Sequence, residues 1–153
     1  MKKITTSEKQ TFELAKEFAA NLQGGEVIAL YGDLGAGKTV FVRGLAAGLG
    51  VKEIVKSPTF VIMKCYLGKK LNLCHIDAYR LSRGAELAAI GALDFWGKKN
   101  TVSIIEWADR VPELLNGVKN LIKIRIEHLG QDKRKISFPL LLAVAYNRGI
   151  DFN

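Results

Sequence analysis

The sequence predicts an α/β fold, a three-layer sandwich in which helices cover a mixed, mostly parallel central sheet with added antiparallel hairpins. Short apolar runs without alternation, at residues 27–31 and 101–106, are typical of strands buried on both faces of a parallel sheet. A glycine-rich turn joins the first run to a helical segment. Two further pairs of β-rich segments, each separated by a short turn, indicate hairpins.

The chain has 153 residues, which suits one domain, and we assign that domain to residues 1–153. Its hydrophobic content of 48% and charged content of 25% are those of a globular protein that folds by burial. No apolar run approaches the ~20 residues of a membrane span, and the first ten residues lack the apolar stretch of a signal peptide. We therefore expect a cytoplasmic protein without membrane contact.

The first helix is expected over residues 7–22, where apolar residues recur at helical spacing. Ser7 and Gln10 fit a capping box, and Gly24-Gly25 supplies a stop. A second helix is expected over 39–49, ended by Gly50. The remaining predicted elements are a hairpin of 60–66 with 71–77, a short helix over 85–90, a hairpin of 121–127 with 135–138, and a short helix over 140–147.

The charge and the cysteines restrict the class of protein. The net charge is +8, and residues 51–100 carry nine basic and four acidic residues, an excess that favours an anionic partner or simply a basic surface. The two cysteines, Cys65 and Cys74, belong to no metal-ligand spacing. They could face each other across the first hairpin, but we expect free thiols in a reducing cytosol.

The segment GDLGAGKT, residues 32–39, meets the phosphate-binding pattern G-x-x-x-x-G-K-[ST] at every fixed position. It lies between a predicted strand and a predicted helix, as that loop requires, so the fold is expected to be that of a P-loop NTPase. Glycines let backbone N–H groups turn toward a polyphosphate, and the following helix adds its positive end. We assign nucleotide contacts to Gly32, Asp33, Leu34, Gly35, Ala36, Gly37, Lys38, Thr39 and Val40.

Chemistry at this loop needs a cation and carboxylates. Lys38 is expected between the β- and γ-phosphates of ATP, and the Thr39 hydroxyl is expected to bind Mg²⁺. Asp77 and Glu106 each close a predicted strand and would lie at the same sheet edge, within reach of the metal. Alternatively, each carboxylate caps a turn or pairs with Arg80 or Arg110.

Two other classes of P-loop protein fit less well. Small GTPases use an N-K-x-D segment, which the sequence lacks, and a D-x-x-G segment, whereas Asp77 is followed by Ala78, Tyr79 and Arg80. A small-molecule kinase needs an arginine-rich lid, and only Arg80, Arg83 and Arg110 could serve. A kinase thus stays a weak alternative.

Four segments together resemble the TsaE family, the bacterial ATPases required for threonylcarbamoyladenosine modification of tRNA. They are, in order, GDLGAGKT, VKSPTF (55–60), HIDAYRL (75–81) and IEW (105–107). The resemblance implies that Glu106 is a Mg²⁺-associated acid and that Asp77 is a Walker-B-like aspartate. It also implies a switch-like loop at 57–59, where Thr59 senses the γ-phosphate or positions water; the alternative is a plain strand-entry turn. Lys38, Asp77, Glu106 and Thr59 are thus the catalytic candidates, and Thr39, Glu106 and Asp77 the metal candidates.

The resemblance extends to residues outside these roles. Similar proteins approach the nucleotide base near Ser7, Glu8 and Thr11, although capping also explains Ser7. Trp107 would flank the nucleotide or fill the core. Tyr79 and Arg80 would face a partner or pair with acids.

The family's partners are the TsaB and TsaD proteins. Around Arg83 this chain departs from the family, because the usual acidic run is reduced to Glu86. The departure raises local positive charge and suggests an RNA-facing surface that contacts tRNA. Within the resemblance two functions stay open, a partner-dependent ATPase with slow turnover alone and a nucleotide-gated binding module with little turnover.

Overall fold

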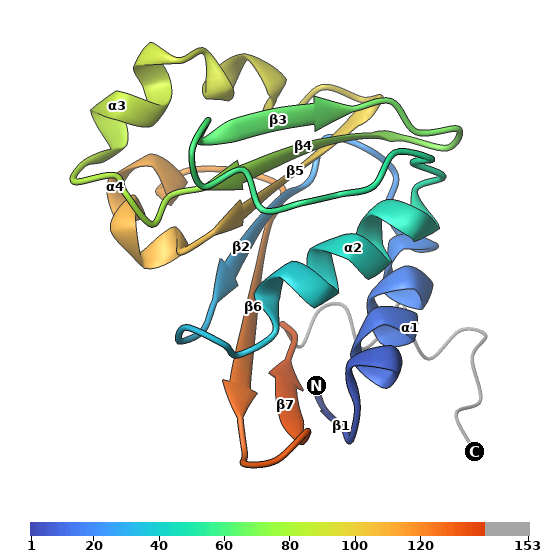
Figure 1. Cartoon of the computed structure of the whole chain (residues 1–153). Helices are drawn as coiled ribbons and strands as arrows, with labels where there is room; N and C mark the ends of the chain where they lie inside the picture. The colour runs from blue at the N-terminus through green and yellow to red at the C-terminus, as the bar shows by residue number, and fades with distance from the viewer. Residues whose placement is uncertain (140–153) are drawn as a thin grey trace.

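The computed structural model describes residues 1–139, and its centre is a seven-stranded mixed sheet. The strands lie in the order β1-β7-β6-β2-β5-β4-β3 (Figure 1). The four central strands, β6, β2, β5 and β4, are parallel, and β1, β7 and β3 add antiparallel pairs at the two edges. The strands are β1 (Lys2–Thr5), β2 (Val27–Tyr31), β3 (Met63–Tyr66), β4 (Asn72–Asp77), β5 (Thr101–Glu106), β6 (Leu121–His128) and β7 (Arg134–Ser137).

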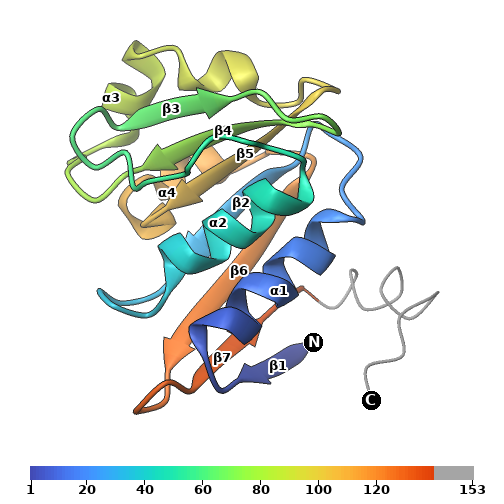
Figure 2. The ribbon, with the colours of Figure 1, turned by 45° about the vertical axis from the view of Figure 1, so that its right-hand side comes forward.

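Helices cover both faces of the sheet, which confirms the three-layer prediction (Figures 1 and 2). The long helices α1 (Glu8–Ala19) and α2 (Lys38–Gly48) lie on one face. The other face carries α3 (Gly84–Ala89), α4 (Pro112–Leu115) and the short 3₁₀ turns η1 (Ala92–Phe95) and η2 (Ala108–Arg110). Of these, the sequence predicted only a short helix at 85–90.

Strand β2 is apolar throughout because it contributes to two cores. Ile28 and Leu30 pack into the cluster under α1 and α2. Val27 and Ala29 alternate with them and pack into the cluster on the opposite face. The apolar run is continuous because β2 is buried on both faces, as predicted.

Helices α1 and α2 approach each other closely because α2 carries glycines on the contacting face. A Cβ at Gly44 would lie 2.1 Å from the carbonyl oxygen of Phe12, and a Cβ at Gly48 would lie 2.4 Å from that of Lys16. No side chain fits at either position. Phe18, Phe41 and Phe138 fill the space beneath the helices, with ring centroids 5.4–6.3 Å apart.

The ends of α1 differ in part from the prediction. Ser7 accepts a hydrogen bond from the Gln10 backbone N–H at 3.1 Å, and Gln10 Oε1 accepts one from the Thr6 N–H at 2.7 Å. The cap is therefore present. The helix ends at Ala19 rather than residue 22, where Lys70 donates to the carbonyl oxygens of Ala19 and Ala20.

Both predicted hairpins form, with shifted bounds. Strand β3 begins at Met63 instead of residue 60, because the N–H groups of Val61 and Ile62 turn back to the carbonyl oxygen of Pro58. Strand β6 is one residue longer than predicted, and β7 begins and ends one residue earlier than predicted. Strand β1, which pairs with β7, was not predicted. The predicted helix at 140–147 lies outside the described residues.

The two cysteines are free and lie directly opposite each other on β3 and β4, as considered from the sequence. Burial raises the pKa of the Cys74 thiol, while Cys65 is exposed. Cys74 therefore stays protonated at neutral pH.

The parallel register brings the expected functional segments to one edge. Leu30, near the end of β2, pairs with Glu106, and Asp77 pairs with the same Glu106 from the other side. The loop after β2 and the last residues of β4 and β5 therefore meet at the carboxyl edge of the sheet.

Candidate nucleotide-binding site

The loop at residues 32–39 joins β2 to α2 and can be formed only with glycine at key positions. Gly32 has φ 152° and Gly37 has φ 100°, both in the region that favours glycine. A Cβ at Gly32 would lie 2.4 Å from the carbonyl oxygen of Ile126. No side chain caps the N-terminus of the 11-residue helix α2, so its first N–H groups face the loop. This is the backbone arrangement that binds phosphate groups.

Lys38 is held inside the site. It is 5% exposed, and its Nζ donates to the carbonyl oxygens of Gly32 at 2.6 Å and Asp33 at 2.9 Å. The ammonium lies 3.8 Å from the centre of the Trp107 ring. Burial lowers the pKa of Lys38, although the nearby carboxylates, Glu106 foremost, oppose that shift. A bound anion would replace the loop carbonyls as the partner of this charge.

Glu106 ends β5 and is joined to α2. The Thr39 hydroxyl lies 3.3 Å from both carboxylate oxygens of Glu106. Nε2 of His75, on the neighbouring strand β4, lies 2.8 Å from Oε1 of Glu106. His75 is fully buried, and within the described residues its Nδ1 has no hydrogen-bond partner. Glu106 is thus fixed from a helix on one side and a strand on the other.

Asp77 ends β4 and has a different set of partners. The hydroxyl groups of Ser57 and Thr59 lie 2.9 and 2.7 Å from its Oδ2. The Tyr79 backbone N–H donates to Oδ1 at 3.0 Å. The structure therefore joins Thr39 to Glu106 and joins the 57–59 segment to Asp77. The sequence also suggested Arg80 or Arg110 as a partner of these acids. In the described residues neither arginine forms an ion pair with them.

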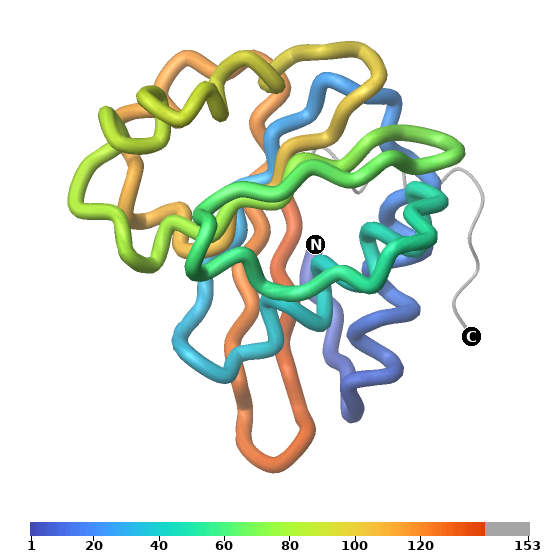
Figure 3. Tube along the Cα trace, turned by 45° about the horizontal axis from the view of Figure 1, so that its top comes forward, coloured from blue at the N-terminus to red at the C-terminus, as the bar shows by residue number. Residues whose placement is uncertain are grey.

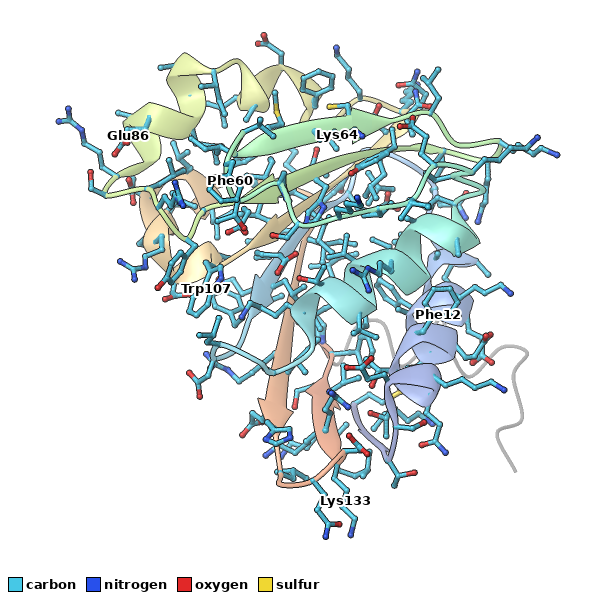
Figure 4. All side chains as sticks on the ribbon, viewed as in Figure 1. Phe12, Phe60, Lys64, Glu86, Trp107 and Lys133 are labelled. Atoms are coloured by element: carbon cyan, nitrogen blue, oxygen red, sulfur yellow. The ribbon has the colours of Figure 1, made fainter. Side chains whose placement is uncertain are left out.

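Trp107 follows Glu106 and has φ 58° and ψ 44°. This left-handed conformation costs about 1–2 kcal/mol for a residue with a side chain. It places the indole beside the loop (Figure 4), against Lys38 and 4.9 Å from the Tyr79 ring. Trp107 thus flanks the site and is only partly buried. Strained residues at a strand end are typical of functional sites.

The three N-terminal candidates, Ser7, Glu8 and Thr11, have different surroundings in the structure. Glu8 lines the cavity at the loop. Thr11 is buried and bonds to the Thr5 hydroxyl at 2.8 Å, and Ser7 caps α1. The structure therefore uses Ser7 and Thr11 for local folding and brings only Glu8 to the cavity.

Arg134 is a site residue that the sequence did not reveal. It begins β7, is 5% exposed and lies against Gly37, where a Cβ would be 2.6 Å from its Nε. Its Nη2 lies 3.6 Å from Glu8, and its Nε has no partner in the described part of the chain. In the sequence it belongs to a polar turn, and its burial depends on the docking of β7 beside the loop.

These groups enclose a cavity of about 370 Å³. It is lined from the loop, Ser57 and Thr59, the ends of β4 and β5, Glu8 and Arg134. Among the loop candidates, Leu34, Gly35, Gly37, Lys38, Thr39 and Val40 line it, whereas Gly32, Asp33 and Ala36 shape the loop behind it. Within residues 1–139 there is no group of three or more His, Cys, Asp or Glu side chains that could hold a metal. The hydroxyl of Thr39 and the carboxylate of Glu106 are nevertheless hard oxygen donors, and Mg²⁺ takes most other ligands from phosphates and water.

A phosphate-binding loop between a parallel strand and a helix, with carboxylates at the same sheet edge, defines a P-loop nucleotide-binding protein. The model of the family "Threonylcarbamoyl adenosine biosynthesis protein TsaE" matches residues 5–136. The chain therefore belongs to the TsaE family, which confirms the resemblance seen in the sequence.

Individual relatives agree with the family match. The chain is 41% identical over 134 residues to the tRNA threonylcarbamoyladenosine biosynthesis protein TsaE of Bacillus subtilis, covering 88% of this chain and 82% of that protein. It is 37% identical over 138 residues to the TsaE of Treponema pallidum, covering 90% and 98%. The crystal structure of Bacillus subtilis YdiB superimposes with a TM-score of 0.69 at 37% identity, covering 90% of this chain and 83% of that one.

Proposed function

We propose that this protein binds ATP with Mg²⁺ and hydrolyses it in the synthesis of threonylcarbamoyladenosine in tRNA. The observation that carries the proposal is the contact between Thr39, at the start of α2, and Glu106, at the end of β5. Family membership supplies the pathway. A cytoplasmic location belongs to the same proposal, and no described helix is long and apolar enough to cross a membrane.

Each side chain has a role that follows from its position. Lys38 would exchange the carbonyl oxygens of its own loop for phosphate oxygens, and the N–H groups at the start of α2 would bind the same anion. Thr39 and Glu106 would hold Mg²⁺, and the ion would supply positive charge that offsets the charge of the phosphates. Arg134 would add a second positive charge on the Glu8 side of the cavity.

Asp77 and Thr59 would act on the attacking water. The Thr59 hydroxyl is bonded to Asp77 beside the cavity, so the pair can orient a water molecule or respond to the γ-phosphate. Arg134 is the one arginine among the described residues that lines the cavity. With little further positive charge available, turnover by the protein alone should be slow.

The TsaB and TsaD proteins would supply the further positive charge that the isolated site lacks. Leu34 in the loop and Phe60 in the 57–62 segment are more than 80% exposed, close to the nucleotide cavity. Exposed apolar side chains of this size are typical of protein contacts. A partner that covers them would also sense the segment bonded to Asp77.

The test is ATP hydrolysis with Mg²⁺ by the purified protein, alone and with TsaB and TsaD, beside a Lys38→Ala variant. We expect slow turnover alone, stimulation by the partners, and loss of both in the variant. Hydrolysis that survives Lys38→Ala would show that the assigned site is wrong.

A nucleotide-gated binding module is the second candidate. It is favoured by the link from Asp77 to an exposed segment, since such a link can report bound nucleotide without rapid turnover. If nucleotide binds and changes the affinity for TsaB and TsaD while no combination hydrolyses it, this function replaces the first.

A further inference from the structure

The edge of the sheet opposite the nucleotide site carries two copies of the sequence Gly-Lys-Lys. Residues 68–70 precede β4, and residues 97–99 precede β5. Strands β4 and β5 are parallel neighbours with Asn72 opposite Thr101, and the Asn72 N–H donates to the carbonyl oxygen of Asn100 at 2.8 Å. The two loops therefore lie side by side, away from the phosphate-binding loop (Figure 3).

A fifth lysine extends this cluster. Lys119 precedes β6, and the next residue, Asn120, accepts a hydrogen bond from the Val27 N–H at the start of β2. The carbonyl of Lys99 lies against Gly24, just before β2. We refer to Lys69, Lys70, Lys98, Lys99 and Lys119 as the lysine edge.

The charge of the lysine edge is largely uncompensated. All five side chains are exposed, and in the described part of the chain none forms an ion pair. Lys70 caps α1 and Lys98 lies over the Phe95 ring, which leaves Lys69, Lys99 and Lys119 extending from their loops. Glu26 precedes β2 in the adjacent loop, and its two oxygens accept from the N–H groups of Gln23 and Gly24.

We propose that the lysine edge binds the phosphate backbone of tRNA. The inference rests on the proposed role in tRNA modification and not on ATP hydrolysis. Lysines on adjacent loop tips contact phosphates without reading bases, which suits a helical RNA surface. An anionic membrane fits less well because Leu67, at 80% exposed, is the one exposed large apolar side chain described in the lysine-bearing loops, and peripheral membrane binding needs an apolar face.

This surface differs from the one expected around Arg83. That residue precedes α3, after the carboxyl end of β4, and its N–H donates to Glu86 at 3.2 Å. Hydrogen bonds from Ser82 lower the pKa of Glu86, so this acid stays ionised beside Arg83. Four of the nine basic residues in 51–100 belong to the lysine edge instead.

The experiment compares two triple variants of equal net charge. Lys69→Gln/Lys99→Gln/Lys119→Gln removes the three extended lysines of the edge. The control, Lys2→Gln/Lys123→Gln/Lys133→Gln, removes exposed lysines from β1, β6 and the β6–β7 turn, where Figure 4 places Lys133 at the far tip of the hairpin. Fluorescence anisotropy with a labelled, unmodified tRNA transcript gives affinity as a function of salt concentration.

We expect the edge variant to bind tRNA about tenfold more weakly and its salt slope to fall by about 2 to 3, the counterion release of three phosphate contacts. The control should change affinity by about twofold or less. An equal loss in both variants, or no loss in either, overturns the proposal. So does a loss of binding to phosphatidylserine vesicles with tRNA affinity unchanged, since that result assigns the edge to a membrane.

ATP hydrolysis by the same variants separates this inference from the proposed ATPase activity. We expect the edge variant to retain wild-type turnover and a wild-type thermal unfolding midpoint. If the wild type hydrolyses no ATP and tRNA binding still depends on the edge, the ATPase proposal fails alone. If turnover is normal and the edge variant binds tRNA like the wild type, only the lysine edge is wrong.

Discussion

Two acids stand next to each other at the carboxyl edge of the sheet, and they are held in different ways. Glu106 and Asp77 are almost equally buried, at 3% and 4% exposed. Glu106 bonds to Thr39 on a helix and His75 on a strand, both rigid elements. Asp77 bonds to two hydroxyls of an exposed loop segment. Two equally buried carboxylates thus differ in their partners, because Glu106 bonds to regular elements and Asp77 to a loop.

Removal of the fixed carboxylate should have the largest effect. We expect Glu106→Ala to lower kcat for ATP hydrolysis by about 100-fold or more, since one group that stabilises the transition state is worth about 3 kcal/mol. Steady-state kinetics across Mg²⁺ concentrations measure this. Glu13→Ala, on the exposed side of α1, is the control. A variant that keeps wild-type kcat would remove Glu106 from the site.

The contact between His75 and Glu106 can be tested by removing the imidazole. His75→Ala leaves a cavity and removes a buried partner of the carboxylate, so the free energy of unfolding should fall by about 2–3 kcal/mol. Urea denaturation measures the loss. His128→Ala provides a matched control, because His128 is exposed. Equal stability of the two variants would mean that the contact between His75 and Glu106 contributes nothing.

The link to Asp77 should be weaker and local. Thr59→Val removes the hydroxyl that bonds to Asp77 and to Ser57. A loss of about 1 kcal/mol should increase opening of the segment about fivefold. Chymotrypsin cleavage after Phe60, which is 85% exposed, reports the opening. Thr101→Val at the opposite edge of the sheet should leave the rate unchanged. A Thr59→Val rate equal to the wild type would remove the distinction between the two acids.

The smallest effect concerns Lys38, which faces both acids. Its pKa is lowered by burial, so between that value and 10.5 the unfolded chain binds more protons than the folded one. The contribution of Lys38 to stability therefore rises with pH through this window. Urea denaturation from pH 8 to pH 10 should show a steeper rise in the wild type than in Lys38→Met. Parallel curves would mean that the pKa of Lys38 is the same in the folded and the unfolded chain.

The sequence predicts the parts of this site whose signals are local. The apolar run of β2, the glycines of residues 32–39 and the start of α2 all carry their structural reason within a few residues. Asp77 and Glu106 were predicted together because strand ends in a parallel sheet share an edge. The short strand β1 was missed because four residues give too little periodicity.

Other features depend on contacts between distant segments. Arg134 lies in a polar turn of the sequence, and only the docking of β7 against Gly37 buries it. His75 reaches Glu106 through strand register, and the left-handed backbone of Trp107 carries no signature in its residue type. Prediction from the sequence ends where tertiary contacts decide the outcome.

The glycines of α2 have a mechanical consequence. Because Gly44 and Gly48 let the backbone of α1 lie directly on α2, we expect the two helices to move together as one unit. The first turn of α2 carries Lys38 and Thr39, and the first turn of α1 carries Glu8, next to Arg134. A displacement of the α2 terminus by a bound phosphate would then be transmitted to the opposite wall of the same cavity.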